Sequence, residues 1–160
     1  MDSQAVKNTD CASQTGWCHY KRTNGIKRHM LVDVLWFPIW VHVTTANVSD
    51  KQGWKELVKK YQEIVSKLQT LLLDNGYNGK WFKISIGKLC KWNVKVNITP
   101  KPNGWKGFKP VHKRWVVERS NAWMDKCRRL HKNCERYLDT SEAMIKLCFI
   151  RLMARRIRKW

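Results

Sequence analysis

The stretch LLLDNGYNGK, residues 71–80, places an acid at the end of an apolar run and follows it with a turn. A short, largely apolar run from Thr70 to Leu73 that stops at Asp74, Asn75 and Gly76 has the form of a buried strand ending in a loop. An unpaired carboxylate at the end of a buried strand is costly unless it binds a cation or faces solvent. Asp74 is therefore the first candidate for a functional residue.

The flanking sequence alternates between strand and helix patterns. Residues 28–34 and 36–45 predict an antiparallel hairpin, and Ser49 and Asp50 can cap a helix with apolar positions every three or four residues as far as Leu68. The further predicted elements are a short helix over 79–90, a strand over 92–98, a basic loop over 99–110, a helix over 114–130 and a last helix from Asp139 to about Ile157. This order, without a long linker, predicts one α/β domain over residues 1–160.

Positive charge is the strongest feature of the composition. The 160 residues include 32 Lys and Arg against 12 Asp and Glu, which gives a formal net charge of +20. No acid lies after Glu142 or between Asp74 and Glu118, and the latter interval holds ten basic residues: Lys80, Lys83, Lys88, Lys91, Lys95, Lys101, Lys106, Lys109, Lys113 and Arg114. Such a surface concentrates a polyanion because phosphate contacts release condensed counterions, so DNA or RNA is the expected partner. A merely solubilising cationic surface is the alternative.

Membrane, secretory and zinc-binding functions are disfavoured by the sequence. The longest uncharged stretch, residues 34–49, is shorter than the roughly 20 apolar residues of a bilayer span. The N-terminus lacks the apolar core of a secretory signal, which predicts a cytoplasmic protein with free cysteines and no membrane partner. Cys127, His131 and Cys134 have nearly the spacing of zinc ligands on a helix, but without a second ligand pair we expect structural roles. The basic C-terminal helix is apolar around most of its circumference, which favours burial over a membrane interface.

Five stretches, taken in order, carry a resemblance to a known family. They are MDSQAVKNT at 1–9, KRHMLVD at 27–33, LLLDNGYNGK at 71–80, RWVVERSNAW at 114–123 and TSEAMIKLCFIRLMARRI at 140–157. Together they resemble the catalytic domain of bacterial insertion-sequence transposases of the DDE superfamily, most closely the group named after insertion sequence five. The resemblance implies a ribonuclease H-like fold, in which helices flank a mixed sheet and three acids meet at the ends of two strands and on one helix.

The same resemblance assigns the chemistry to Asp2, Asp74 and Glu118. As catalytic and metal-binding acids they would hold two Mg²⁺ or Mn²⁺ ions about 4 Å apart, which serve cleavage of a DNA strand and its transfer to a target. Hard cations of this kind prefer oxygen ligands and offset the repulsion between clustered carboxylates. From the residues alone, Glu118 has a second interpretation, a salt bridge to Arg114 on a solvated helix face.

Basic residues near Glu118 are the candidates for contacts with DNA. In the family, an Arg four residues before the Glu and a basic residue about seven after it are associated with the transposon end. The resemblance and the local charge together give four candidate DNA-binding residues, Lys113, Arg114, Arg119 and Lys126. Trp115 and Trp123 on the same predicted helix are expected to pack in the core rather than to stack on bases.

The beginning of the chain departs from the family pattern. Relatives carry a helical N-terminal region and an apolar strand that leads into the first acid, whereas Met1 alone precedes Asp2. We therefore expect a sheet that lacks most of its first strand, with Asp2 loosely held. The alternative function is a catalytically inactive, truncated DNA-binding remnant. Either form is expected in the cytoplasm, bound to DNA of the nucleoid, as a homodimer or in association with a full-length transposase.

Overall fold

The molecule is built around one strand that is buried over most of its length. The computed structural model describes residues 2–65, 67–89, 94–98 and 115–157. In its four-stranded antiparallel sheet, β3 (Thr23–Val32) pairs with β1 (Asp2–Lys7), β2 (Gly16–Cys18) and β4 (Pro38–Thr45). Met30 faces both Asp2 and Val41 in the register, so β1 and β4 lie on opposite edges of β3. All residues of β3 from Gly25 to Leu31 are buried.

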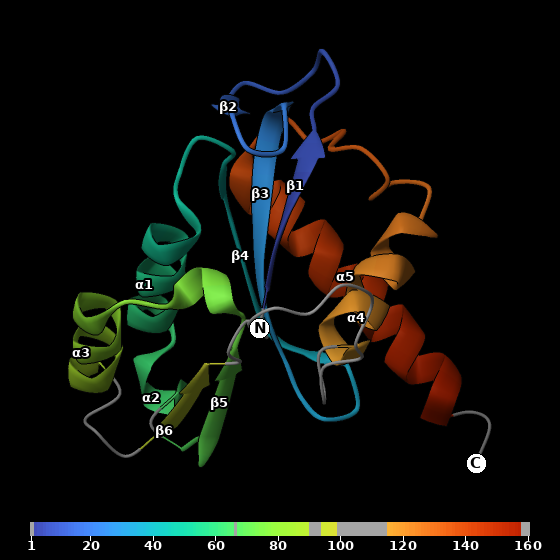
Figure 1. The fold of residues 1–160 in the computed structure, drawn as a ribbon. Coiled ribbons are helices and arrows are strands. Elements are labelled where there is room, and N and C mark those ends of the chain that lie inside the picture. Colours follow the sequence, from blue (N-terminus) through green and yellow to red (C-terminus); the bar gives the residue numbers. More distant parts are fainter. Residues whose placement is uncertain (1, 66, 90–93, 99–114, 158–160) are drawn as a thin grey trace, which may run out of the picture.

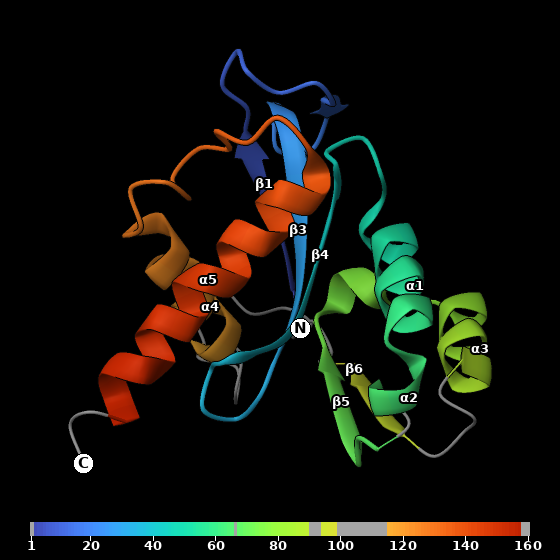
Figure 2. The ribbon, with the colours of Figure 1, turned by 180° about the vertical axis from the view of Figure 1, so that it is seen from behind.

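Helices cover both faces of this sheet (Figures 1 and 2). Adjacent residues of a strand point to opposite faces, and Met30 and Leu31 accordingly belong to two different hydrophobic clusters. Leu31 packs in the cluster of α1 (Asp50–Lys60) and α3 (Lys80–Leu89), and the short helix α2 (Gln62–Val65) adds Val65 to it. Met30 packs in the cluster of α4 (Trp115–Asp125) and α5 (Leu138–Ile157).

A smaller parallel sheet completes the fold. It consists of β5 (Thr70–Leu73) and β6 (Lys95–Ile98), and a single 3-10 turn, η1 (Asn75–Tyr77), follows β5. Leu71 and Leu73 of β5 are buried in the cluster that also holds Leu31. The combination of antiparallel and parallel sheets with flanking helices confirms the predicted α/β class and is consistent with a ribonuclease H-like domain.

Several predicted boundaries differ from the structure for identifiable reasons. The sequence predicted no strands over 2–7 or 16–18, because β1 has one buried residue, Val6, and β2 is only three residues long. The helix predicted as far as Leu68 is interrupted at Tyr61, where the backbone leaves the helical region.

The helix predicted over 114–130 ends at Asp125, since the chain must turn to pair Asn133 with Lys7 of β1. Cys127, His131 and Cys134 therefore do not share a helix face. Within the described residues, no helix is long and apolar enough to cross a membrane. The predicted basic loop over 99–110 lies outside the described residues.

A buried carboxylate joins α5 to both α1 and β4. Glu142 accepts hydrogen bonds from Lys60 Nζ (3.1 Å) and Lys146 Nζ (2.7 Å), and His42 Nδ1 lies 3.6 Å from its Oε2 atom. Burial alone would raise the pKa of Glu142, but the nearby His42 imidazole and the hydrogen bonds from Lys146 and Lys60 outweigh it and hold that pKa well below its usual range. On the face of the sheet that α1 covers, burial lowers the pKa of His29 to about 4.

These two groups predict that acid destabilises the fold. His29 stays neutral in the folded protein, so unfolding takes up a proton below its ordinary pKa of 6.5, and stability falls between that value and about 4. Glu142 contributes stability above its ordinary pKa of 4.5, and this contribution is lost as the pH falls further. The midpoint temperature of thermal unfolding should therefore be nearly constant from pH 7 to 8 and should fall steeply below about pH 6.5.

Glu142→Gln should lower the free energy of unfolding at pH 7 by about 2 kcal/mol. It should also weaken the dependence of the midpoint temperature on pH in the acid range. Asp139→Asn, which alters an exposed acid, should do neither.

Two glycines provide a second test of the packing. A methyl group at Gly53 of α1 would overlap the imidazole of His29, which is fully buried, whereas one at Gly76 would meet nothing within 4 Å. Gly53→Ala should destabilise the protein by at least about 1 kcal/mol, since overpacking outweighs the gain in helix propensity. Gly76→Ala should leave the denaturation midpoint nearly unchanged. Equal midpoints for the two variants would show that α1 does not pack against His29 as described.

Candidate functional site

Asp2 lies at the start of β1, where the sheet holds it in place. Its backbone pairs with Met30, and its half-buried side chain accepts hydrogen bonds from the Ser3 backbone N–H (2.8 Å) and from Asn121 Nδ2 (3.5 Å). Two residues further along β1, Gln4 Nε2 donates to Asp125 Oδ1 at 3.0 Å. The expectation of a loosely held Asp2 is therefore corrected, because sheet pairing and contacts with α4 hold it.

These contacts show how α4 lies against β1. Asp2 contacts Asn121 and Gln4 contacts Asp125, so β1 and α4 run in the same direction. Glu118, in the first turn of α4 and exposed, comes nearly one helical turn before Asn121. The backbone of α4 thus brings Glu118 to the end of the sheet at which β1 begins.

Asp74 is half-buried and directly follows β5, as the sequence predicts. Its carbonyl oxygen accepts a hydrogen bond from the Tyr77 backbone N–H (3.0 Å), which closes the turn. Burial raises the pKa of the Tyr77 phenol, and the negative charges of Asp50, Asp2 and Asp74 raise it further. The Tyr77 hydroxyl group is buried without a hydrogen-bond partner among the described residues. Asp2 and Asp74 therefore act electrostatically on the same buried group, although they come from different sheets.

The part of the chain that the structure describes contains no preformed group of metal-ligand side chains. No group of three or more His, Cys, Asp or Glu side chains there is close enough to hold a metal ion. Cys127, His131 and Cys134 are included in this statement, and the described cysteines are free thiols. The expected role of Asp2, Asp74 and Glu118 as ligands thus depends on their chemistry and on the elements that carry them.

The candidate DNA-binding residues are only partly described. Arg119 and Lys126 are exposed, in α4 and just after it, whereas Lys113 and Arg114 lie outside the described residues, and with them the alternative Arg114–Glu118 salt bridge. Further exposed basic side chains project from α3 and α5: Lys80, Lys83, Lys88, Lys146, Arg151, Arg155 and Arg156. Positive charge therefore occurs on helices at both sides of the main sheet (Figure 1).

The turn between β3 and β4 contributes residues that the sequence did not identify. Trp36 in this turn contacts Trp123 of α4 with a ring-centroid distance of 4.8 Å, which supports core packing for Trp123. Ser120 of α4 donates its hydroxyl proton to the Trp36 carbonyl oxygen at 2.6 Å. No local sequence pattern marks Trp36 or Asn121, because both act through residues that are distant in the chain.

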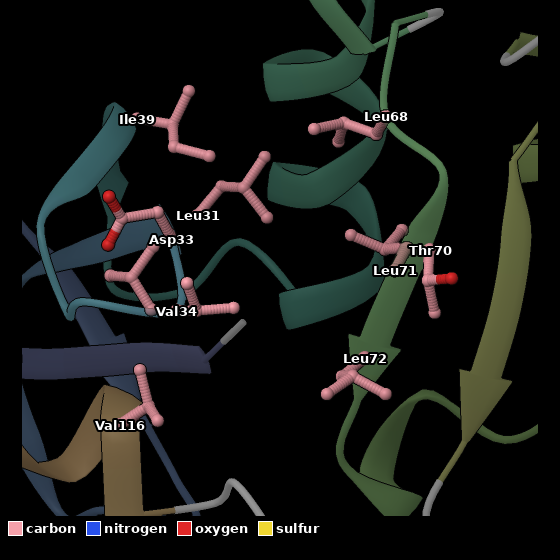
Figure 3. Close-up of a pocket in the computed structure, with 10 residues that line it drawn as sticks. Leu31, Asp33, Val34, Ile39, Leu68, Thr70, Leu71, Leu72 and Val116 are labelled. Atoms are coloured by element: carbon pink, nitrogen blue, oxygen red, sulfur yellow. The ribbon is translucent and has the colours of Figure 1, made fainter.

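An apolar cavity of about 290 Å³ lies between this turn and β5 (Figure 3). Leu31, Ile39, Leu71 and Val116 line it, and Asp33 is the one charged residue among the described lining residues. Figure 3 shows side chains of the turn on one side of the cavity and those of β5 on the other. A cavity so poor in positive charge does not fit a polyanion, so DNA is expected on the basic helices instead.

Comparison with known proteins places the chain in a family. A family model described as transposase DDE domain matches residues 1–153. No curated protein and no solved structure matches the chain. Because the family match covers nearly the whole sequence, the chain belongs to the transposase DDE domain family, whose members act on DNA in transposition. The narrower assignment to the group named after insertion sequence five stays a prediction.

The hydrogen bond from Ser120 tests whether the β3–β4 turn holds α4. Ser120→Ala leaves the buried Trp36 carbonyl without its donor and should cost about 1–2 kcal/mol of unfolding free energy. Ser85→Ala is the matched control. Ser120 and Ser85 each donate a hydrogen bond to the carbonyl four residues earlier in their helix, that of Val116 and that of Trp81, but the bond of Ser85 is exposed. Chemical denaturation of both variants measures the difference, and equal stabilities would contradict the role given to Ser120.

Proposed function

We propose that this chain acts as the catalytic domain of a transposase, which cleaves DNA strands and transfers them with divalent cations held by Asp2, Asp74 and Glu118. Membership of the transposase DDE domain family over residues 1–153 supports the reaction class. The observation that carries the residue assignment is the alignment of α4 with β1, through Asn121 and Asp2 and through Asp125 and Gln4. This alignment directs the first turn of α4, which carries Glu118, toward the end of the sheet where β1 begins at Asp2.

The donor chemistry of these residues fits Mg²⁺ or Mn²⁺. Carboxylate oxygens are the ligands that such hard cations prefer. Burial is the main cause of the raised pKa of Tyr77, and the charges of Asp50, Asp2 and Asp74 add to it. When bound, a pair of ions supplies an activated oxygen nucleophile and stabilises the leaving oxygen. Without cations, three clustered carboxylates repel one another, so bound cations would stabilise their approach.

The other residues of the chain position the acids and the DNA. The Ser3 backbone N–H and Asn121 orient the Asp2 carboxylate, and the turn at Tyr77 fixes the backbone at Asp74. Arg119 and Lys126 bind phosphates and keep the DNA backbone close to the acids. The alternative is a DNA-binding remnant without turnover, which shares the basic surface but does not bind metal at the acids.

Removal of single acids tests the catalytic assignment. Asp74→Ala and Glu118→Gln should each abolish Mn²⁺-dependent cleavage of duplex DNA and weaken Mn²⁺ binding in calorimetric titration by at least about tenfold. Asp139→Asn, which alters an exposed acid in the first turn of α5, is the control and should retain both properties. Retained metal binding in both Asp74→Ala and Glu118→Gln would rule out the proposed site, and an absence of metal binding in the unmodified chain would favour the remnant.

DNA binding itself should depend on charge rather than on the acids. Asp74→Ala should bind duplex DNA as tightly as the unmodified chain or slightly more tightly, since it removes negative charge. For both proteins the logarithm of the affinity should fall linearly with the logarithm of salt concentration, with a slope of several units. Fluorescence anisotropy over a range of salt concentrations measures the slope, and a flat dependence would reject the electrostatic account.

A further inference from the structure

Trp36 adopts a backbone conformation that side chains other than glycine rarely take. Its φ angle is 64°, in the left-handed region. The tight turn that imposes this angle is closed by a hydrogen bond from the Asp33 N–H to the Phe37 carbonyl (2.9 Å), and Asp33 Oδ1 accepts from the backbone of Leu35 and Phe37. Unusual backbone conformations persist only where surrounding contacts determine them. Here the turn directs the Trp36 indole ring toward α4 and α5.

Two guanidinium groups meet at this ring. The Arg156 Cζ atom lies 3.6 Å from the centroid of the Trp36 ring, and the Arg119 Cζ atom lies 4.9 Å from it. Arg156 also lies within 5.6 Å of the Trp123 ring and 5.3 Å of the Phe37 ring. The two arginines come from different helices, α5 and α4, and one indole brings them together.

Both arginines of this pair reach the surface, although the ring that they share is buried. Trp36 is 7% exposed, whereas both arginine residues are exposed. Among the described residues no carboxylate forms a salt bridge with Arg156, and its neighbour on α5, Arg155, is also basic. A guanidinium stacked on an aromatic ring loses little further freedom when it binds a ligand, and its edge stays available for hydrogen bonds.

We propose that Trp36, Arg119 and Arg156 form a phosphate-binding site for the DNA backbone, in which the indole ring holds both guanidinium groups ready. Guanidinium groups bind phosphate oxygens in a planar, bidentate geometry that a lysine ammonium does not reproduce. Arg119 directly follows Glu118 on α4, so this site borders the acid that we assign to catalysis. The proposal rests on DNA as the partner under the proposed function and names one place where DNA is held.

The competing explanation is that Arg156 only covers an apolar surface. Long basic side chains commonly pack their stems on apolar groups while their charge faces solvent. In that case, exchange of Arg156 would change the stability of the protein and leave DNA affinity unaffected. The two explanations therefore differ in what a charge-conserving substitution does to DNA binding.

The test compares Arg156→Lys with Arg155→Lys in binding to a short labelled duplex at several salt concentrations, without divalent metal. Arg156→Lys keeps the charge but loses the planar stacked group, so affinity should fall about fivefold while the salt slope is retained. Arg155→Lys, on the same turn of α5, should change affinity by less than about twofold. Trp36→Leu, once shown to be folded by circular dichroism, removes no charge and should weaken binding as Arg156→Lys does.

Equal affinities for Arg156→Lys and Arg155→Lys would overturn the site, whatever the outcome for Trp36→Leu. A lower thermal midpoint for Arg156→Lys with unchanged affinity would establish the covering role instead. Because no metal is present, these results are independent of catalysis at Asp74 and Glu118. If the unmodified chain does not bind duplex DNA at low salt, the DNA partner of the proposed function fails together with this site.

Discussion

The burial of β3 on both faces and along both edges is the constraint on which the other elements depend. From Gly25 to Leu31 each residue is buried, with β1 and β4 alongside and helices above and below. A strand in this position must satisfy all its backbone groups through neighbouring strands. It therefore fixes where β1 begins, and with it Asp2, and it fixes the direction in which the β3–β4 turn leaves the sheet. Both candidate sites, the acids and the arginine pair, lie beside elements that β3 positions.

Polar residues inside β3 determine which helix packs on which face. Arg28 is almost fully buried and reaches Gln4, which in turn bonds Asp125 at the end of α4. Burial lowers the pKa of Arg28 to about 10, so it remains cationic at neutral pH. On the other face, Lys27 pairs with Asp50 at 2.9 Å at the start of α1, and His29 bonds Thr44. The contact of Arg28 through Gln4 and the ion pair of Lys27 each involve one particular helix, which hydrophobic burial alone would not ensure.

The sequence predicts much of this architecture, and the exceptions share a physical cause. The hairpin of β3 and β4, the buried strand β5 ending at Asp74, α3 and α5 follow from local periodicity, which acts over a few residues. β1 was missed because its alternation is weak: its place in the sheet comes from pairing with β3, some 20 residues later in the chain. Asn121 and Trp36 were missed because each acquires its role through a distant partner, Asp2 or Arg156. The motif residues Asp2, Asp74 and Glu118 were identified by resemblance, and their joint role as metal ligands stays a prediction.

Iron-directed cleavage of the polypeptide tests most directly whether these three acids share bound metal. Fe²⁺ occupies the oxygen-ligand sites of Mg²⁺, and in the presence of ascorbate and peroxide it cuts the backbone next to its ligands. The account predicts fragments that end close to Asp74 and Glu118, together with oxidation at Asp2, all suppressed by excess Mg²⁺. Cleavage confined to other regions, such as the segment from Cys127 to Cys134, or cleavage that Mg²⁺ does not suppress, would contradict it.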